Sequence, residues 1–143
     1  LLRLSLRSIG AHYVLRRVLL PVERLVQCFG FHLARLDVRQ NSAFHDKALS
    51  QVLQAAGFAD YDYTGWSEEK RLAFLEKELA TARPFLPPGT ACGPEADAVL
   101  ACYSVLKAHT DKYGPAGVGS IIISMTRSLS DLLVVYLWLR EAG

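Results

Sequence analysis

Only two stretches of this chain have the composition of a β-strand, and longer helical stretches surround both of them. Ser120–Met125 centres on three consecutive isoleucines, which is typical of a short strand buried in a parallel sheet. Phe31–Arg39 is the other candidate, with apolar residues first and charged residues toward its end. Two strands can neither close a barrel nor build a stable sheet alone, so this pattern restricts the chain to part of a larger α/β fold.

The order of the elements predicts that the chain is mostly helical. Helices are expected over Leu1–Ser8, from Pro21 to Gly30, from Ser42 to Gly57, from Ser67 to about Ala82, from Pro94 to Gly114 and over Leu132–Glu141. Three of them separate the two strands, and such a crossover joins parallel neighbours. We therefore predict a partial (β/α) TIM-like barrel with about two parallel strands and extra helices.

Three of these helices carry further signals. Ser42 and Ser67 can each cap the helix that follows, and Glu68 and Glu69 suit the first turn after Ser67. The helix after Ser42 has one apolar stripe, made of Ala48, Leu49, Val52, Leu53 and Ala56. The last helix is apolar on nearly every side, so neighbours should surround it. Ser128 and Asp131 have the spacing of a capping box at its start.

Length, charge and cysteine content restrict the class of protein. The 143 residues suffice for a real core, and residues 1–143 show no internal domain boundary. With 16 basic and 14 acidic residues the net charge is only +2, which argues against nucleic-acid binding. The longest apolar run, Leu132–Leu139, is far short of the roughly 20 residues that span a membrane. Three cysteines without metal-binding spacing indicate a reducing, cytoplasmic location.

The end of the first predicted strand is the candidate site. Asp37 and Arg39 lie two residues apart, so they project to the same side of a strand. Ligands bind at the carboxyl ends of parallel strands, and a guanidinium is suited to holding an anion. Alternatively, the strand simply shows its charges to water. Arg35 shares this face, as a buried ion pair or as a charge inside a barrel, and the sequence does not decide between them.

Two blocks of residues resemble the phosphoenolpyruvate carboxylase family. The first block comprises Phe29-Gly30, Leu33, Leu36-Asp37-Val38-Arg39-Gln40, Ser42 and His45. The second comprises Ile123-Ser124-Met125, Ser130-Asp131-Leu132-Leu133, Val135 and Arg140-Glu141-Ala142-Gly143. Their order and spacing are about those of the family, and the resemblance covers the whole chain. Two positions depart from it: Asn41 stands where the family is often acidic, and Thr126 where alanine is common.

The resemblance implies an enzyme, a carbon–carbon lyase that joins bicarbonate to phosphoenolpyruvate and releases oxaloacetate and phosphate. It implies Mg²⁺ or Mn²⁺ as cofactor and a cytoplasmic homotetramer. The family's histidine motif, its glycine- and arginine-rich loop and its metal-binding acidic strand are absent from this sequence. The chain is therefore expected to be an internal piece of a longer protein, to hold no metal and no catalytic residue, and to be inactive alone. That it begins with Leu1 instead of methionine agrees with this expectation.

The resemblance also assigns roles to residues of the first strand. Arg39 matches the arginine that reaches the phosphate of the substrate, and Asp37 and Gln40 are expected to orient it. Ser124 and Arg127, at the end of the second strand, either border the site or serve the cap and loop of the last helix. The sequence leaves these two roles open.

Two other functions remain compatible with the residues. The chain could be a non-catalytic helical interaction domain, including a degenerate paralogue of the enzyme, or an unrelated small α/β domain that binds an anion. If the chain is instead a piece of the larger enzyme, the last helix and Ile121–Ile123 should bury against elements outside the chain. We therefore expect the isolated chain to self-associate or to be only marginally stable.

Overall fold

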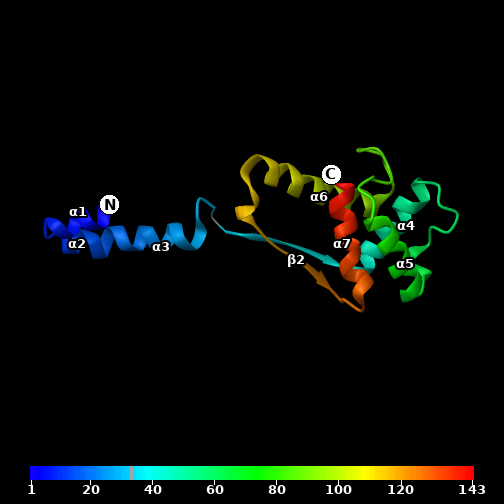
Figure 1. The fold of residues 1–143 in the computed structure, drawn as a ribbon, viewed down its shortest axis with the longest axis horizontal. Coiled ribbons are helices and arrows are strands. Elements are labelled where there is room, and N and C mark those ends of the chain that lie inside the picture. Colours follow the sequence, from blue (N-terminus) through cyan, green and yellow to red (C-terminus); the bar gives the residue numbers. More distant parts are fainter. Residues whose placement is uncertain (33) are drawn as a thin grey trace. The chain divides into compact units, whose positions relative to one another are not determined.

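The computed structural model describes residues 1–32 and 34–143 and divides them into two compact units (Figure 1). The first unit contains Leu1–Leu36 and Ala116–Gly119, and the second contains Asp37–Pro115 and Ser120–Gly143. Leu33, which belongs to the predicted first strand and to the first motif block, lies outside the described residues.

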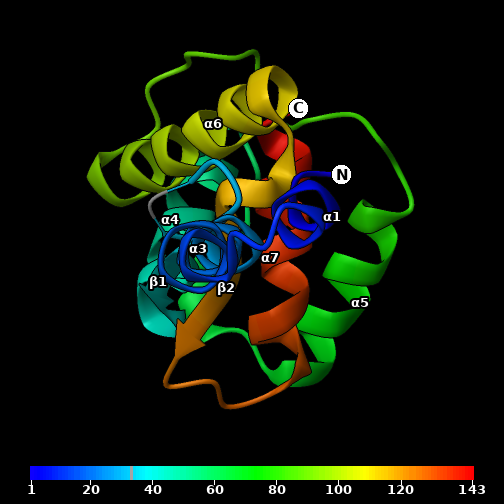
Figure 2. The same ribbon diagram turned by 90° about the vertical axis from the view of Figure 1, so that its left-hand side faces the viewer.

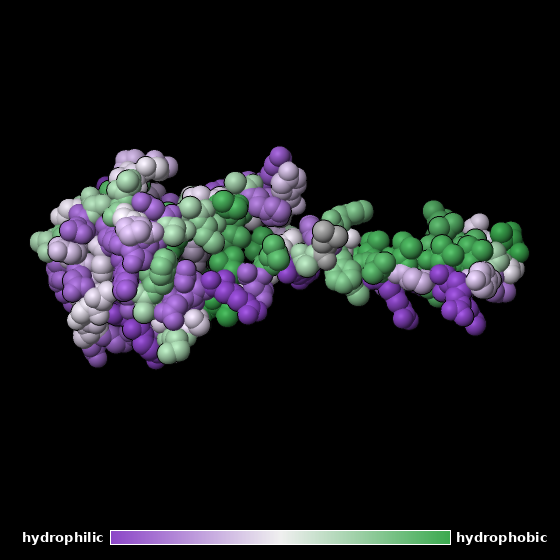
Figure 3. Space-filling view, turned by 180° about the vertical axis from the view of Figure 1, so that it is seen from behind, coloured by the Kyte–Doolittle hydropathy of each residue, from purple (hydrophilic) through white to green (hydrophobic). Residues whose placement is uncertain are grey.

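The first unit consists of short and medium helices. Its elements are α1 (Leu2–Ser8), α2 (His12–Val14), a π-helical turn (Leu15–Leu19) and α3 (Leu20–Phe29). The Nε atom of Arg3 donates to Glu23 Oε2 at 2.5 Å and ties α1 to α3. Hydrophobic side chains gather along one side of these helices and hydrophilic ones along the other (Figure 3). The predicted helix start at Pro21 was too late, because the helical turns run on from His12 without a break.

The two strands form one parallel pair, as predicted. They are β1 (Leu36–Asn41) and β2 (Val118–Ser124). Asp37 lies beside Ser120 and Gln40 beside Ser124, so residue numbers rise in the same direction along both strands (Figure 1). The predicted start of β1 at Phe31 was wrong, because Phe31 lies in the turn that follows Gly30, whose φ is +60°. The α/β class is confirmed, whereas two strands do not show a barrel.

Helices make up most of the second unit. They are α4 (Ser42–Ala55), α5 (Glu68–Leu79), α6 (Pro94–Tyr113) and α7 (Leu129–Glu141), with 3₁₀ turns at Tyr63–Gly65 and Pro115–Gly117. Ser67 caps α5 as predicted, since its Oγ accepts from the N–H of Lys70 at 3.4 Å. At α4 the cap is Asn41 in place of Ser42, because the Asn41 Oδ1 accepts from the N–H of Ala43 at 2.8 Å.

The core of the second unit lies between its four helices. Helix α4 packs against α6, and α5 packs against α7 (Figure 2). The predicted stripe on α4 is confirmed for its central members, since Ala48, Leu49, Val52 and Leu53 are all buried. Trp138 of α7 is fully buried as well.

The described residues cover helix α7 on one side only, whereas its apolar sequence predicts neighbours on nearly every side, some of them outside the chain. Val134, Leu137 and Trp138 face the core, whereas Leu129, Leu132, Tyr136 and Leu139 are 43–62% exposed. These four exposed side chains and Ile121 and Ile123 of β2 line one open apolar groove. The apolar sequence of α7 thus reflects two apolar faces, and the described residues cover only one of them.

We expect this groove to make the isolated chain self-associate, because exposed contiguous apolar surface is a site of association. Light scattering across a concentration series should show mass rising with concentration. The double substitution Leu132→Glu and Leu139→Glu should reduce that rise, whereas Val105→Glu, at an exposed position on α6, should not. A wild-type chain that stays monomeric at every concentration would contradict the expectation.

Candidate functional site

The carboxyl ends of β1 and β2 lie at the same edge of the sheet because the strands are parallel. There the hydroxyl of Ser42, at the start of α4, donates to the backbone oxygen of Met125, just after β2, at 2.8 Å. Met125 has φ +58° and is the one non-glycine residue with positive φ among those described. That conformation costs about 1–2 kcal/mol and persists only where surrounding contacts enforce it. Strained backbone of this kind clusters at functional sites.

Arg39 extends from β1 toward solvent at this edge. Its side chain is 74% exposed, and Nη2 lies 3.4 Å from Asp37 Oδ2. The Asp37 Oδ1 accepts from the backbone N–H of Ser120 at 3.0 Å. That hydrogen bond and the Arg39 contact hold the pKa of Asp37 below its ordinary value. The ionised carboxylate lies against one edge of the guanidinium, while most of the guanidinium stays accessible to an anion from solvent.

The other polar residues of this edge join β1 to its neighbours. The Gln40 Oε1 accepts from the N–H of Asn41 at 2.8 Å, and the Ser124 hydroxyl lies 3.5 Å from the backbone oxygen of Gln40. Ser124 therefore contacts the strand that carries Arg39. Arg35 belongs to the first compact unit, where it is exposed.

Arg127, in the loop between β2 and α7, is held by two buried carboxylates. Its Nη2 donates to Asp46 Oδ2 and to Asp131 Oδ1, both at 2.7 Å, and its Nε donates to Asp131 Oδ2 at 3.2 Å. Its backbone N–H donates to Asp131 as well, at 2.7 Å. Burial alone would raise the pKa of Asp131, but these hydrogen bonds outweigh it and lower the pKa. The side chain of Arg127 nonetheless stays 49% exposed.

Asp46 also pairs with a second arginine from another helix. The Arg71 Nη1 of α5 lies 3.2 Å from the same Asp46 Oδ2, and both side chains are less than a tenth exposed. The Arg71 Nη2 donates to the backbone oxygens of Tyr63 and Thr64 at 3.1 Å each. Two arginines thus face two aspartates, Asp46 and Asp131, so the charges of this ion network balance.

Glu68 of α5 holds the first turn of α7. Its carboxylate accepts from the Ser128 hydroxyl at 2.8 Å and from the Ser130 hydroxyl and N–H at 2.6 and 3.0 Å. The predicted capping box was therefore wrong in its first half, because the Ser128 hydroxyl donates to Glu68 and accepts no helix N–H. The second half of a capping box is a hydrogen bond from the backbone to the acidic side chain. Here the Asp131 carboxylate accepts from the backbone N–H of Arg127, one residue before Ser128.

His45, next to Asp46 on α4, is buried without a hydrogen bond to its ring among the described residues. It is 1% exposed, and its ring centroid lies 6.4 Å from that of Tyr103 and 6.2 Å from that of Trp138. Neither ring nitrogen has a partner among the described residues. Burial lowers the pKa of His45 to about 4, so the ring is neutral at pH 7.

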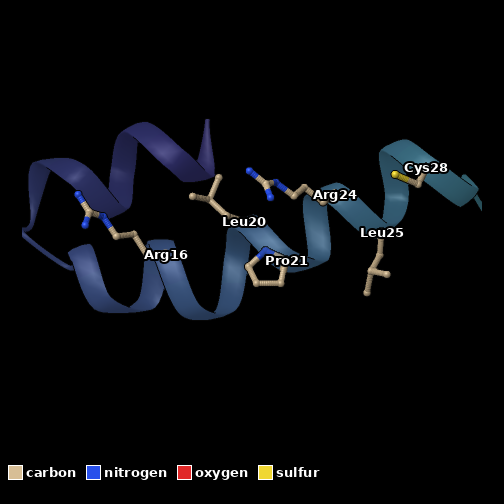
Figure 4. Close-up of a pocket in the computed structure, with 6 residues that line it drawn as sticks. All are labelled: Arg16, Leu20, Pro21, Arg24, Leu25 and Cys28. Carbon is tan, nitrogen blue, oxygen red and sulfur yellow. The ribbon is translucent and has the colours of Figure 1, made fainter.

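The described residues offer no group of three or more histidine, cysteine or acidic side chains that could hold a metal ion. The buried carboxylates Asp46 and Asp131 are already engaged by arginines, so they do not fit a divalent cation. A shallow pocket on α3 is lined by Arg16, Leu20, Pro21, Arg24, Leu25 and Cys28 (Figure 4). It contains no buried polar group, and we therefore assign the candidate site to the strand edge. No helix in the described ranges is long and apolar enough to cross a bilayer.

The sequence pattern did not reveal the pairing of Asp46 and Arg71 with Arg127. One signal was available on α4, where Ser42, His45 and Asp46 continue the apolar stripe of Leu49 and Leu53 toward the amino end. Polar residues at core-facing positions of a helix are candidates for buried networks. The pairing partners on α5 and in the loop had no such signal.

The parallel strand pair, its helical crossover and its charged carboxyl edge define this chain as part of an α/β protein. Comparison with known proteins is more specific, since the family model for phosphoenolpyruvate carboxylase matches residues 1–143. The chain therefore belongs to the phosphoenolpyruvate carboxylase family.

Curated relatives carry the same family name. The chain is 40% identical to the phosphoenolpyruvate carboxylases of Histophilus somni (strain 2336) and Rhodothermus marinus, over 140 and 139 residues. It is 37% identical to that of Vibrio vulnificus (strain CMCP6) over 139 residues. Each match covers 97% of this chain but only 14–15% of the relative. The chain thus spans about 15% of the length of these enzymes.

Proposed function

We propose that this chain supplies part of the phosphoenolpyruvate-binding wall of a phosphoenolpyruvate carboxylase. The observation that carries the proposal is Arg39, an exposed guanidinium at the carboxyl edge of a parallel strand, in contact with Asp37. It stands in the Leu36–Gln40 segment that resembles the family's strand motif. The intact protein would join bicarbonate to phosphoenolpyruvate and release oxaloacetate and phosphate.

The role of Arg39 in this reaction is to bind the phosphoryl group. A guanidinium can donate two parallel hydrogen bonds to phosphate oxygens and keeps its charge at any physiological pH. A hydrogen bond to a charged group contributes roughly 1.5–3 kcal/mol, and this contact would also orient the phosphorus for attack by bicarbonate. Asp37 would act on Arg39 by restricting its rotamers, and Gln40 by fixing the end of β1.

The remaining chemistry would belong to residues outside this chain. The family implies a divalent metal, Mg²⁺ or Mn²⁺, in the intact enzyme. Because the described residues do not fit such an ion, we assign them no step that involves it. The intact enzyme would be a cytoplasmic homotetramer with a TIM-like barrel, and residues 1–143 would be one segment of that barrel domain.

A graft can test the proposal. We expect the Rhodothermus marinus enzyme, with its matched segment replaced by residues 1–143, to be active in an oxaloacetate-forming assay. Arg39→Lys in this graft should lower kcat/KM for phosphoenolpyruvate at least about tenfold, because an ammonium cannot donate the bidentate pair.

Arg83→Lys is the matched control, since Arg83 is an exposed arginine in the loop after α5, and its kinetics should match those of the unmodified graft. Near-normal kcat/KM for Arg39→Lys would refute the role of Arg39. A folded but inactive unmodified graft would instead favour a degenerate, non-catalytic segment.

A further inference from the structure

The loop that follows β2 is fastened to three different helices. Ser42 of α4 holds the backbone oxygen of Met125, and Glu68 of α5 holds Ser128. Asp131, in the first turn of α7, holds both the backbone and the side chain of Arg127. Such dense anchoring is unusual for a surface loop, since loops are ordinarily the mobile and variable parts of a fold.

Asp46 is the central member of this anchoring. Its Oδ2 is shared between Arg127 of the loop at 2.7 Å and Arg71 of α5 at 3.2 Å, and its side chain is only 5% exposed. Asp46 lies one helical turn after Ser42, and Ser42 follows directly on the strand that carries Arg39. The first turns of α4 are therefore joined covalently to the end of β1. They also contact the loop after β2, through Ser42 and Asp46.

A contribution to stability alone does not explain the network. A buried ion pair is often no more stabilising than apolar residues of similar volume, because desolvation offsets the Coulomb attraction. The network does fix geometry, since two carboxylates define the plane of the Arg127 guanidinium. Met125, two residues before Arg127, has a left-handed conformation, and the hydroxyl of Ser42, in the first turns of α4, donates to its backbone oxygen.

We propose that Asp46 is a positioning residue for substrate binding, acting through Arg127 to fix the 125–128 loop beside the strand end that carries Arg39. This inference rests on the proposed function. Asp46 itself does not contact the substrate. It sets the conformation of the loop that borders the phosphate site, so its loss changes substrate affinity more than it changes the chemical step.

The test is Asp46→Asn in the active graft, a substitution that keeps the volume and removes the charge. We expect KM for phosphoenolpyruvate to rise about fivefold, the size of effect that mutations in coupled networks produce, with kcat changed less than twofold. Hydrogen exchange followed by mass spectrometry should show faster exchange in peptides that cover 125–130. Asp46→Glu should restore part of the affinity, because it returns a carboxylate to Arg127.

The matched control is Glu141→Gln at the opposite end of α7. Glu141 is 4% exposed and pairs with the 9% exposed Arg140 at 2.6 Å, so this change also removes one buried carboxylate from an arginine. It should leave both KM and the hydrogen exchange of peptides that cover 125–130 as in the unmodified graft. If Glu141→Gln raises KM as much as Asp46→Asn does, the effect is general destabilisation and the positioning role is refuted.

The outcomes separate this inference from the proposed function. If Arg39→Lys weakens substrate use while Asp46→Asn changes neither KM nor loop exchange, the positioning role is wrong and the proposed function stands. If the unmodified graft is inactive, the proposed function fails, and the positioning role that rests on it fails as well. Faster loop exchange together with a selective rise in KM supports the role of Asp46.

Discussion

Replacement of Trp138 by alanine should lower the free energy of unfolding of the second unit by about 3–5 kcal/mol, the range for deleting a large aromatic side chain from a core. Trp138 is fully buried in α7 and packs near the ring of His45. Its Nε1 has no hydrogen-bond partner among the described residues, so the loss comes from packing and from the cavity that remains. Because domains are stable by only about 5–15 kcal/mol, the variant should be close to unfolding at 37 °C.

Urea unfolding followed by fluorescence can measure this loss. Both tryptophans of the chain lie in the second unit, so Trp66 still reports on that unit after Trp138 is removed. Val105→Ala is the control, because Val105 lies on α6 outside the apolar groove and is 69% exposed. It should change stability by less than about 1 kcal/mol. Equal losses in the two variants would show that Trp138 is not a core residue.

The helices of the second unit could be predicted because several sequence signals agree there. Ser67, followed by Glu68 and Glu69, predicted the start of α5, and Pro94 predicted the start of α6. A periodic stripe fixed the buried side of α4. The parallel direction of the strands followed from the helices between them, since a crossover of this length returns the chain to the same end of the sheet.

Features that depend on partners could not be predicted in the same way. The start of β1 depends on which residues pair with β2. The composition of Phe31–Arg39 does not indicate which residues pair. The exposed side of α7 has the apolar composition of a core-facing side, because composition does not indicate which element covers a residue. In both cases neighbouring elements, and not local propensity, decide the structure.

The candidate site shows the same division. Asp37 and Arg39 were placed together by the alternation of a strand, which is a local rule, and their 3.4 Å contact follows from it. The link from Asp46 to Arg127 joins residues 81 positions apart and has no local signature. Polar residues on the core-facing side of a helix, as in the first turns of α4, nevertheless depart from the rule that this side is apolar. Such departures are expected at functional sites.

Acidification should destabilise the chain through His45 before Asp131 and Glu68 are protonated, because the pKa values of these two carboxyls are lowered. The folded-state pKa of His45 is about 4, against an ordinary value of 6.5, because burial opposes the charged form. The folded state therefore binds fewer protons than the unfolded state between these values. The stability from His45 is fully present above pH 6.5 and is lost as the pH falls toward 4, by about 3 kcal/mol in total. The nearby carboxylates Asp46 and Asp131 reduce this effect but do not reverse it.

The comparison of wild type with His45→Phe isolates the histidine. Between pH 7 and pH 5 the wild-type unfolding free energy should fall by about 2 kcal/mol, and the variant should lose much less, because phenylalanine cannot be protonated. Asp131 and Glu68 have lowered pKa values, so their protonation destabilises the chain only at more acidic pH. His12→Asn, at an exposed position of α2, should keep the wild-type dependence on pH. If His45→Phe and wild type lose stability equally over this interval, His45 is not the buried neutral group that its surroundings require.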